Sequence, residues 1–268
     1  MSLIAHSALV GLAPAALAML LTVSLLAGIG IAAVGPGGVL LTIGLFAITA
    51  LPPPVVAGTA IVTHLASGVV GSAAYLRSGQ LRARPTRHLA LVLSAATLVG
   101  APLGVWLNTL VSRRGFGVLL ASFALAIGLL LWRRGRHIRR SAPDAPAVRH
   151  LPSLVAATIG LAGATASGLF GLGGPMIAVP LLVAARVPIL AALAAAQAQS
   201  LVIAALGSAD YAWHGSIDWA MAAFVGVPQA FGVVAGWRIA HAVPTRALTY
   251  TLAAALITLA PYLALWSG

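Results

Sequence analysis

The sequence contains no cysteine and only three acidic residues, and each scarcity excludes a class of protein. Without cysteine there is no disulfide framework, no thiolate metal site and no cysteine nucleophile. Lysine is also absent, because all fifteen basic residues are arginine, and charged residues make up only 7% of the 268 positions. Since a typical soluble domain carries about 25% charged residues, the composition argues against a soluble protein.

Apolar residues are in large excess: 61% of the chain is hydrophobic and the mean hydropathy is +1.06. A spanning helix needs about 20 apolar residues, so we expect an all-α polytopic membrane protein with 8–10 membrane segments. The net charge of +12 would suggest nucleic acid in a soluble protein, but here the arginines lie between apolar runs. We therefore expect the lipid bilayer, and no nucleic acid, as the partner. The apolar runs fall at about 9–34, 39–51, 55–76, 89–111, 116–132, 153–170, 176–185, 189–212, 219–241 and 247–266.

The two halves of the chain resemble each other when the sequence is displaced by 136 positions. Gly37-Gly38 then falls on Gly173-Gly174, and Tyr75 falls on Tyr211. This recurrence predicts two homologous helical repeats, an architecture common in secondary transporters. The division predicted is residues 1–135 as the first transmembrane repeat, 136–152 as an arginine-rich cytoplasmic linker, and 153–268 as the second repeat.

The placement of arginine distinguishes two topologies. If the short runs 39–51 and 176–185 cross the membrane, each half has five spans and all arginines except Arg113 and Arg114 share the side of the linker. If they re-enter without crossing, Arg186, Arg238 and Arg246 move to the other side. The positive-inside rule favours the first alternative, in which the repeats are inverted.

Each short run is preceded by a glycine-rich break where a helix must stop and another start. Broken backbone inside a bilayer is tolerated only where it is buried in protein or lines a cavity. The restarted helix presents free N–H groups and a positive dipole end, so two such breaks could flank one anion. The alternative is that these glycines serve only tight turns and close packing. The candidate anion-binding glycines are Gly35, Gly37, Gly38, Gly171, Gly173 and Gly174.

Polar side chains inside the remaining runs are few, and intramembrane polar groups are candidate functional residues. Under the displacement the pair Thr63-His64 falls on the pair Gln199-Ser200. An amide can donate to an oxyanion, whereas Ser and Thr can also bond to their own helix. The candidate substrate-binding side chains are Thr59, Thr63, His64, Gln197, Gln199 and Ser200.

His64 is also the candidate for carrying a coupling proton, because imidazole titrates near neutral pH; the alternative is a neutral packing role. The two carboxylates near membrane segments have simpler interpretations. Asp218 is expected to cap the helix that begins at Trp219. Asp210 is expected to pair with a loop arginine or water at a helix end.

Two stretches carry a resemblance to a known family. The first runs Ser167-Gly168-Leu169-Phe170-Gly171-Leu172-Gly173-Gly174-Pro175-Met176 and on to Leu182, and the second is Gly215-Ser216-Ile217-Asp218-Trp219. Together they resemble the sulfite exporter TauE/SafE family of membrane transporters. The resemblance implies movement of a small sulfur-containing or organic anion across the cytoplasmic membrane, with proton linkage. The substrate expected is sulfite, a sulfonate or another organic anion.

Two other functions remain open. A passive anion channel could use the same glycine breaks without alternating access. An intramembrane enzyme is a remote alternative, based on Ser167 and a distant His241, but no further signature of a protease follows them. We expect no enzyme, no metal and no cofactor, because metal-spaced histidines and a phosphate-binding loop are missing from the sequence.

Overall fold

Each apolar run forms a helix in the computed structural model, which describes residues 8–137, 151–242 and 245–266. Seven of the helices are long and apolar enough to cross a bilayer, and the described residues contain no strand. This confirms the predicted all-helical, multi-pass membrane fold. The predicted number of 8–10 membrane segments requires that shorter apolar helices also cross, and it stays a prediction. The helices are α1 (Pro14–Ala33), α2 (Gly38–Ile48), α3 (Pro53–Arg77), α4 (Arg84–Leu110), α5 (Arg113–His137), α6 (Ser153–Phe170), α7 (Pro175–Ala184), α8 (Ile189–Trp213), α9 (Trp219–Ala242) and α10 (Thr245–Trp266), with short 3-10 turns at Ala8–Gly11 and Gln80–Arg82.

Proline sets the start of several helices. Pro14, Pro53 and Pro175 each occupy the first position of α1, α3 and α7, where the missing N–H would have no partner inside the helix in any case. Proline therefore costs little at these starts, and the bounds of the helices follow from local sequence. The core of the predicted linker, residues 138–150, lies outside the described residues, and the division into two repeats and a linker stays a prediction.

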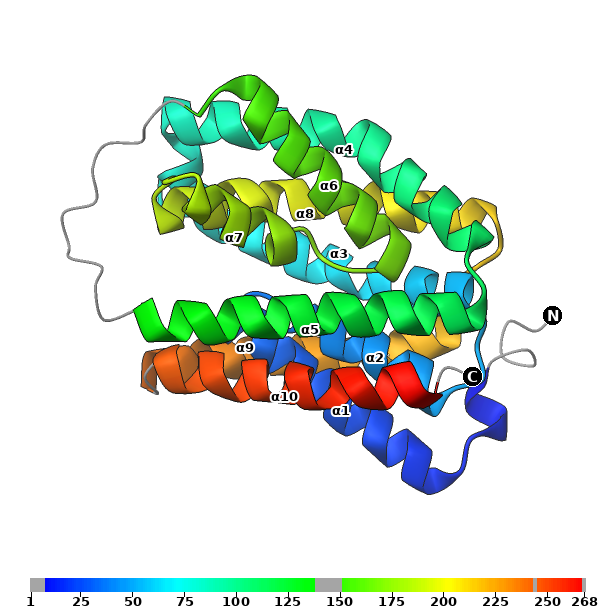
Figure 1. The fold of residues 1–268 in the computed structure, drawn as a ribbon. Coiled ribbons are helices and arrows are strands. Elements are labelled where there is room, and N and C mark those ends of the chain that lie inside the picture. The colour runs from blue at the N-terminus through cyan, green and yellow to red at the C-terminus, as the bar shows by residue number, and fades with distance from the viewer. Residues whose placement is uncertain (1–7, 138–150, 243–244, 267–268) are drawn as a thin grey trace.

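The helices run between two ends of the molecule, seen at the left and right of Figure 1. One end, which we name the arginine-rich end, holds the α3–α4 and α7–α8 connections; His88 of α4 and Ser153 of α6 also meet there, with Nε2 and Oγ 3.1 Å apart. Its described arginines include Arg77, Arg82, Arg84, Arg87, Arg133 and Arg186.

The opposite end holds the α2–α3, α4–α5 and α8–α9 connections. Arg113 ties two of them together, because its guanidinium donates to the carbonyl oxygens of Thr49 (3.0 Å) and Leu51 (2.5 Å). Arg114 follows at the same end. The arginines of the described residues are thus concentrated at one end, as the positive-inside rule requires of a cytoplasmic face.

The short helices α2 and α7 each run antiparallel to the helix that precedes them, α1 and α6 respectively. A Cβ built on Gly37 would overlap the backbone of Gly30 and Ile31 in α1, and one on Gly44 would stand 2.7 Å from Val23 Cγ1. In the second half, a Cβ on Gly163 of α6 would lie 3.8 Å from Ile177 Cβ of α7. The helix directions therefore alternate through α2 and α7, as the five-span alternative requires. The orientation in the membrane stays a prediction.

The helices pair across the two halves of the chain. α1 packs along α9, α6 packs along α4, α3 packs on α8, and α5 packs on α10 (Figure 1). Glycines allow the close approaches, since a Cβ on Gly232 of α9 would stand 3.1 Å from Gly28 Cα of α1. The displacement by 136 positions exchanges the α1–α9 pair with the α6–α4 pair. Such an exchange is expected of a duplicated chain and supports the inferred repeats.

Candidate functional site

The two glycine-rich breaks lie between helices, and their glycines have different tasks. In the first, Gly35 adopts a φ of +107° after the end of α1. In the second, Gly171 ends α6 with a φ of +71° and packs directly on the backbone of Ala57 in α3. A side chain at either position would strain the backbone. Gly35 and Gly171 therefore shape the turns, and Gly37 allows α2 to pack on α1.

The remaining glycines of the breaks face polar side chains. His64, close to the middle of α3, lies between the breaks: a Cβ on Gly38 would overlap its Cε1 and stand 2.9 Å from its Nε2. On the other side, a Cβ on Gly173 would stand 3.3 Å from its Nδ1. One imidazole thus contacts the start of α2 and the connection that leads into α7. The N-termini of two short helices, with their positive dipole ends, meet at this ring.

Ser200 of α8 completes the cluster. Its Oγ accepts a hydrogen bond from the backbone N–H of Gly174 at 3.1 Å, and a Cβ on Gly173 would lie 3.3 Å from the same oxygen. The displacement that relates the halves places Gly38 on Gly174 and His64 on Ser200. In both halves, therefore, the polar residue of the long helix contacts the matching glycine at the start of the short helix.

The buried imidazole has an unused polar atom. His64 is 2% exposed, and its Nε2 has no hydrogen-bond partner among the described residues. Buried polar groups in native proteins are almost always paired, with protein, water or ligand. We therefore define the His64 site as His64, Gly38, Gly173, Gly174 and Ser200. Its arrangement of a hydrogen-bonding ring, a hydroxyl and two helix N-termini suits an oxyanion.

Comparison with known proteins identifies the family. A family described as "Sulfite exporter TauE/SafE" matches residues 20–265, nearly the whole chain. The chain belongs to this family.

A relative supports the same assignment for this TauE/SafE member. A protein of Xylella fastidiosa (strain 9a5c) named "Probable membrane transporter protein" is 28% identical over 200 residues, which cover 74% of this chain and 74% of that one. No solved structure matches the chain significantly. The protein is therefore a multi-pass membrane transporter of the cell membrane, and the predicted family is confirmed.

The two candidate threonines of this TauE/SafE member lie outside the His64 site. Thr59 Oγ1 accepts a hydrogen bond from the backbone N–H of Asp218 at 3.1 Å, so it holds the α8–α9 connection. Thr63 donates to the carbonyl oxygen of Ala60 in its own helix at 2.7 Å. Both hydroxyls have structural partners, as the alternative interpretation of intramembrane threonine allows.

The two glutamines also point elsewhere. Gln197 donates from Nε2 to the carbonyl oxygen of Ser67 at 3.0 Å and so joins α8 to α3. Gln199 donates to the carbonyl oxygen of Gly160 at 2.9 Å and lies closest to α6 and α4. The structure therefore brings together His64, Ser200 and three of the six candidate glycines, and it separates both glutamines from them.

The two carboxylates lie at the opposite end. Asp218 caps α9 as predicted, because its Oδ1 accepts from the N–H of Met221 at 2.9 Å. Asp210 Oδ1 lies 3.2 Å from Nδ1 of His214, one turn further along the chain. The partner predicted for it was a loop arginine or water. Neither contact involves the His64 site.

Sequence reasoning missed one residue beside the site. Met176, the second residue of α7, is 2% exposed and its Cε lies 3.4 Å from where a Cβ on Gly38 would stand. An apolar residue in an apolar helix carries no pattern that marks it. Only its position directly after the second break could have drawn attention to it.

Proposed function

We propose that this protein is a secondary transporter that moves a small anion, such as sulfite, a sulfonate or another organic anion, and that the anion binds at the His64 site. The observation that carries the proposal is the convergence of two helix N-termini on one buried imidazole. Backbone N–H groups at a helix start favour anions, and glycine lets an oxygen approach them closely.

We further propose that His64 carries the coupling proton. The ring lies against Gly38 at the start of α2 and against Gly173 of the α6–α7 connection, with Ser200 of α8 beside Gly173, and none of these three residues carries a charge. In surroundings of low dielectric constant, an anion at the helix starts would favour the imidazolium, and the imidazolium would favour the anion. Such reciprocal coupling is what links the movement of two solutes. Ser200 cannot titrate near neutral pH, so only one half would carry the proton.

The experiment is uptake of radiolabelled sulfite and sulfoacetate by the purified protein in liposomes with an imposed pH gradient. Secondary transport predicts saturable uptake driven by the gradient, and counterflow when unlabelled anion is trapped inside. A passive channel would conduct the anion without counterflow. Membership in a transporter family disfavours the enzyme alternative. Failure of the protein to move either sulfite or sulfoacetate would refute the proposal.

A further inference from the structure

The side-chain amide of Gln229 in α9 is buried without a hydrogen bond. The residue is 2% exposed, and neither its Oε1 nor its Nε2 has a partner among the described residues. Buried polar side chains in native proteins are rarely left with both ends unused. The amide therefore calls for a partner that the described part of the chain does not supply.

The direction of the Gln229 side chain follows from two glycines of the same helix. A Cβ on Gly226 would lie 3.4 Å from Thr63 Cγ2, so Gly226 faces α3. A Cβ on Gly232 would overlap the carbonyl oxygen of Leu25, so Gly232 faces α1. Because three residues turn a helix by about 300°, Gln229 lies between these two directions, about 60° from each. It points into the interior between α1 and α3.

The helix α2 lies across this interior. α1 and α3 each pack on both α2 and α9, so the four helices enclose a common interior. A Cβ on Gly28 would overlap the carbonyl oxygen of Gln229, and a Cβ on Gly30 of the same helix would stand 2.9 Å from Gly37 Cα. Two residues span only about 3 Å of helix. The amide is therefore almost level with the start of α2 and points toward that helix.

His64 meets the start of α2 from α3. Its Nδ1 lies on the side of Gly173 in the second break, whereas a Cβ on Gly38 of α2 would stand 2.9 Å from its Nε2. Nε2 is also the ring nitrogen without a partner among the described residues. Two unpartnered polar groups, from α3 and α9, thus lie on the side of the first break.

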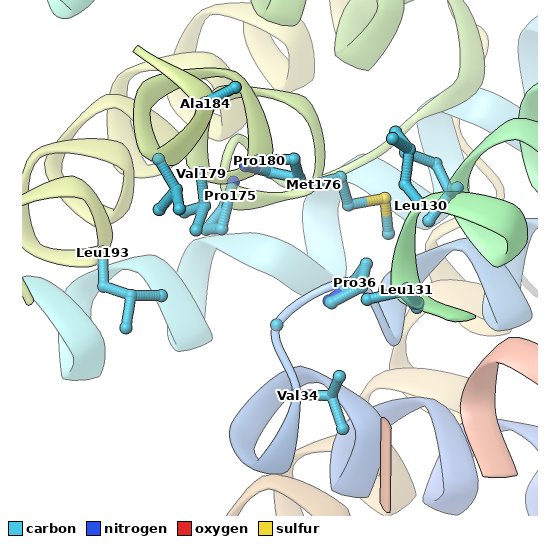
Figure 2. A pocket seen from close by; sticks show the side chains of 13 residues that line it. Val34, Pro36, Leu130, Leu131, Pro175, Met176, Val179, Pro180, Ala184 and Leu193 are labelled. Atoms are coloured by element: carbon cyan, nitrogen blue, oxygen red, sulfur yellow. The ribbon is translucent and has the colours of Figure 1, made fainter. Parts of the chain in front are cut away.

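The groups around the start of α2 suit an anion better than a cation. A carboxamide can donate two hydrogen bonds, and the positive dipole end of a helix disfavours a cation. The pocket of about 270 Å³ between the first break, α5 and α7 has no such donors, because every residue that lines it is apolar or glycine (Figure 2). An anion at the start of α2 would therefore find side-chain donors on the side of His64 and Gln229.

We propose that Gln229 is a further binding residue of this transporter, and that its Nε2 donates a hydrogen bond to the transported anion at the start of α2. This inference rests on the proposed anion transport at the His64 site. It adds to that site a donor from α9, a helix that contributes no other group to it.

The second half of the chain uses its buried amide differently. Gln199 donates from Nε2 to the carbonyl oxygen of Gly160 at 2.9 Å and lies 3.3 Å from Thr97 Oγ1, so that only its Oε1 has no partner among the described residues. The displacement by 136 positions places Gln229 on Leu93, which is fully buried in α4. A leucine therefore suits the matching place in the other half, and Gln199 provides a structural amide for comparison.

The test is Gln229→Leu, with the initial rate of radiolabelled sulfoacetate uptake in liposomes measured over a range of concentrations. We expect KM to rise roughly tenfold to a hundredfold, the effect of losing one hydrogen bond to a charged group. The unfolding temperature should stay at or above that of the wild type, because the substitution removes an unpaired buried polar group and no hydrogen bond within the protein. Gln229→Met, which is unbranched and adaptable, should give the same result if leucine does not fit.

The matched control is Gln199→Leu. This substitution removes the hydrogen bond to Gly160, so the unfolding temperature should fall. KM of the folded molecules should stay within about twofold of the wild-type value, because this amide does not bind the anion. The two glutamines thus predict opposite effects on stability and on KM.

The outcomes separate this inference from the proposed function. A wild-type KM in both Gln229 variants would overturn the binding role and leave anion transport intact. A fall of the unfolding temperature with an unchanged KM would show that Gln229 holds a structural water, and an equal rise of KM in Gln199→Leu would show a general effect of packing; each would also overturn it. Failure of the wild-type protein to transport sulfoacetate or sulfite would overturn both proposals.

Discussion

Replacement of Gly173 by alanine tests whether the backbone of the second break receives the anion. Gly173 does not adopt a positive φ, and the new Cβ would stand 3.3 Å from both His64 Nδ1 and Ser200 Oγ. These two side chains need to shift by only a few tenths of an ångström to accept it. We therefore expect the variant to fold, with a loss of stability within about 1 kcal/mol.

The effect on transport should be much larger. The methyl group would occupy the space between the backbone, the imidazole and the hydroxyl, where an oxyanion would have to lie. Loss of one hydrogen bond to a charged group costs about 1.5–3 kcal/mol, which corresponds to roughly tenfold to a hundredfold in affinity. The assay is the initial rate of labelled anion uptake in liposomes over a range of concentrations, with thermal unfolding followed by tryptophan fluorescence.

The control is Gly104→Ala in α4. A Cβ there would overlap the carbonyl oxygen of Thr165 in α6 and stand 2.7 Å from Leu169 N. Overpacking of this kind costs about 1–3 kcal/mol, so the control should lose stability while each folded molecule still transports. Gly37 offers no comparable test, because a side chain there would separate α2 from α1. Normal transport by a stable Gly173→Ala protein would refute the reasoning.

Three further predictions concern the proton, the opposite end and the topology. His64→Gln should still bind the anion in a competition assay but lose its response to a pH gradient, because an amide hydrogen-bonds without titrating; gradient-driven uptake at the wild-type rate would exclude the proton role. Arg113→Ala removes the hydrogen bonds to the connection after α2 and should lower stability by about 1–3 kcal/mol, and an unchanged unfolding temperature would show that these bonds contribute nothing. Because the chain has no native cysteine, Arg77→Cys and Arg186→Cys should react with impermeant thiol reagents from the cytoplasm and Arg114→Cys from outside; labelling of position 186 only from outside would contradict the five-span arrangement.

The sequence by itself indicated the ten apolar runs that form α-helices among the described residues, and each predicted bound lies within about five residues of the observed one. Length and composition of an apolar run decide whether it forms a spanning helix, and proline and glycine act locally to start and stop it. The two breaks, the short helices after them and the capping role of Asp218 were predictable for the same reason. Each depends on neighbouring residues along the chain.

Only the tertiary structure decided which polar residues face the breaks. Gln199 and Ser200 are adjacent in sequence, but one residue turns a helix by about 100°. Ser200 therefore meets Gly174, while Gln199 meets Gly160 of α6. A helix in a membrane is apolar on all sides. The periodicity of its hydrophobic residues therefore does not indicate the direction in which a polar side chain points. The position of His64 between Gly38 and Gly173 depends on how α3 packs against both short helices, and this packing sets contacts between residues far apart in the sequence.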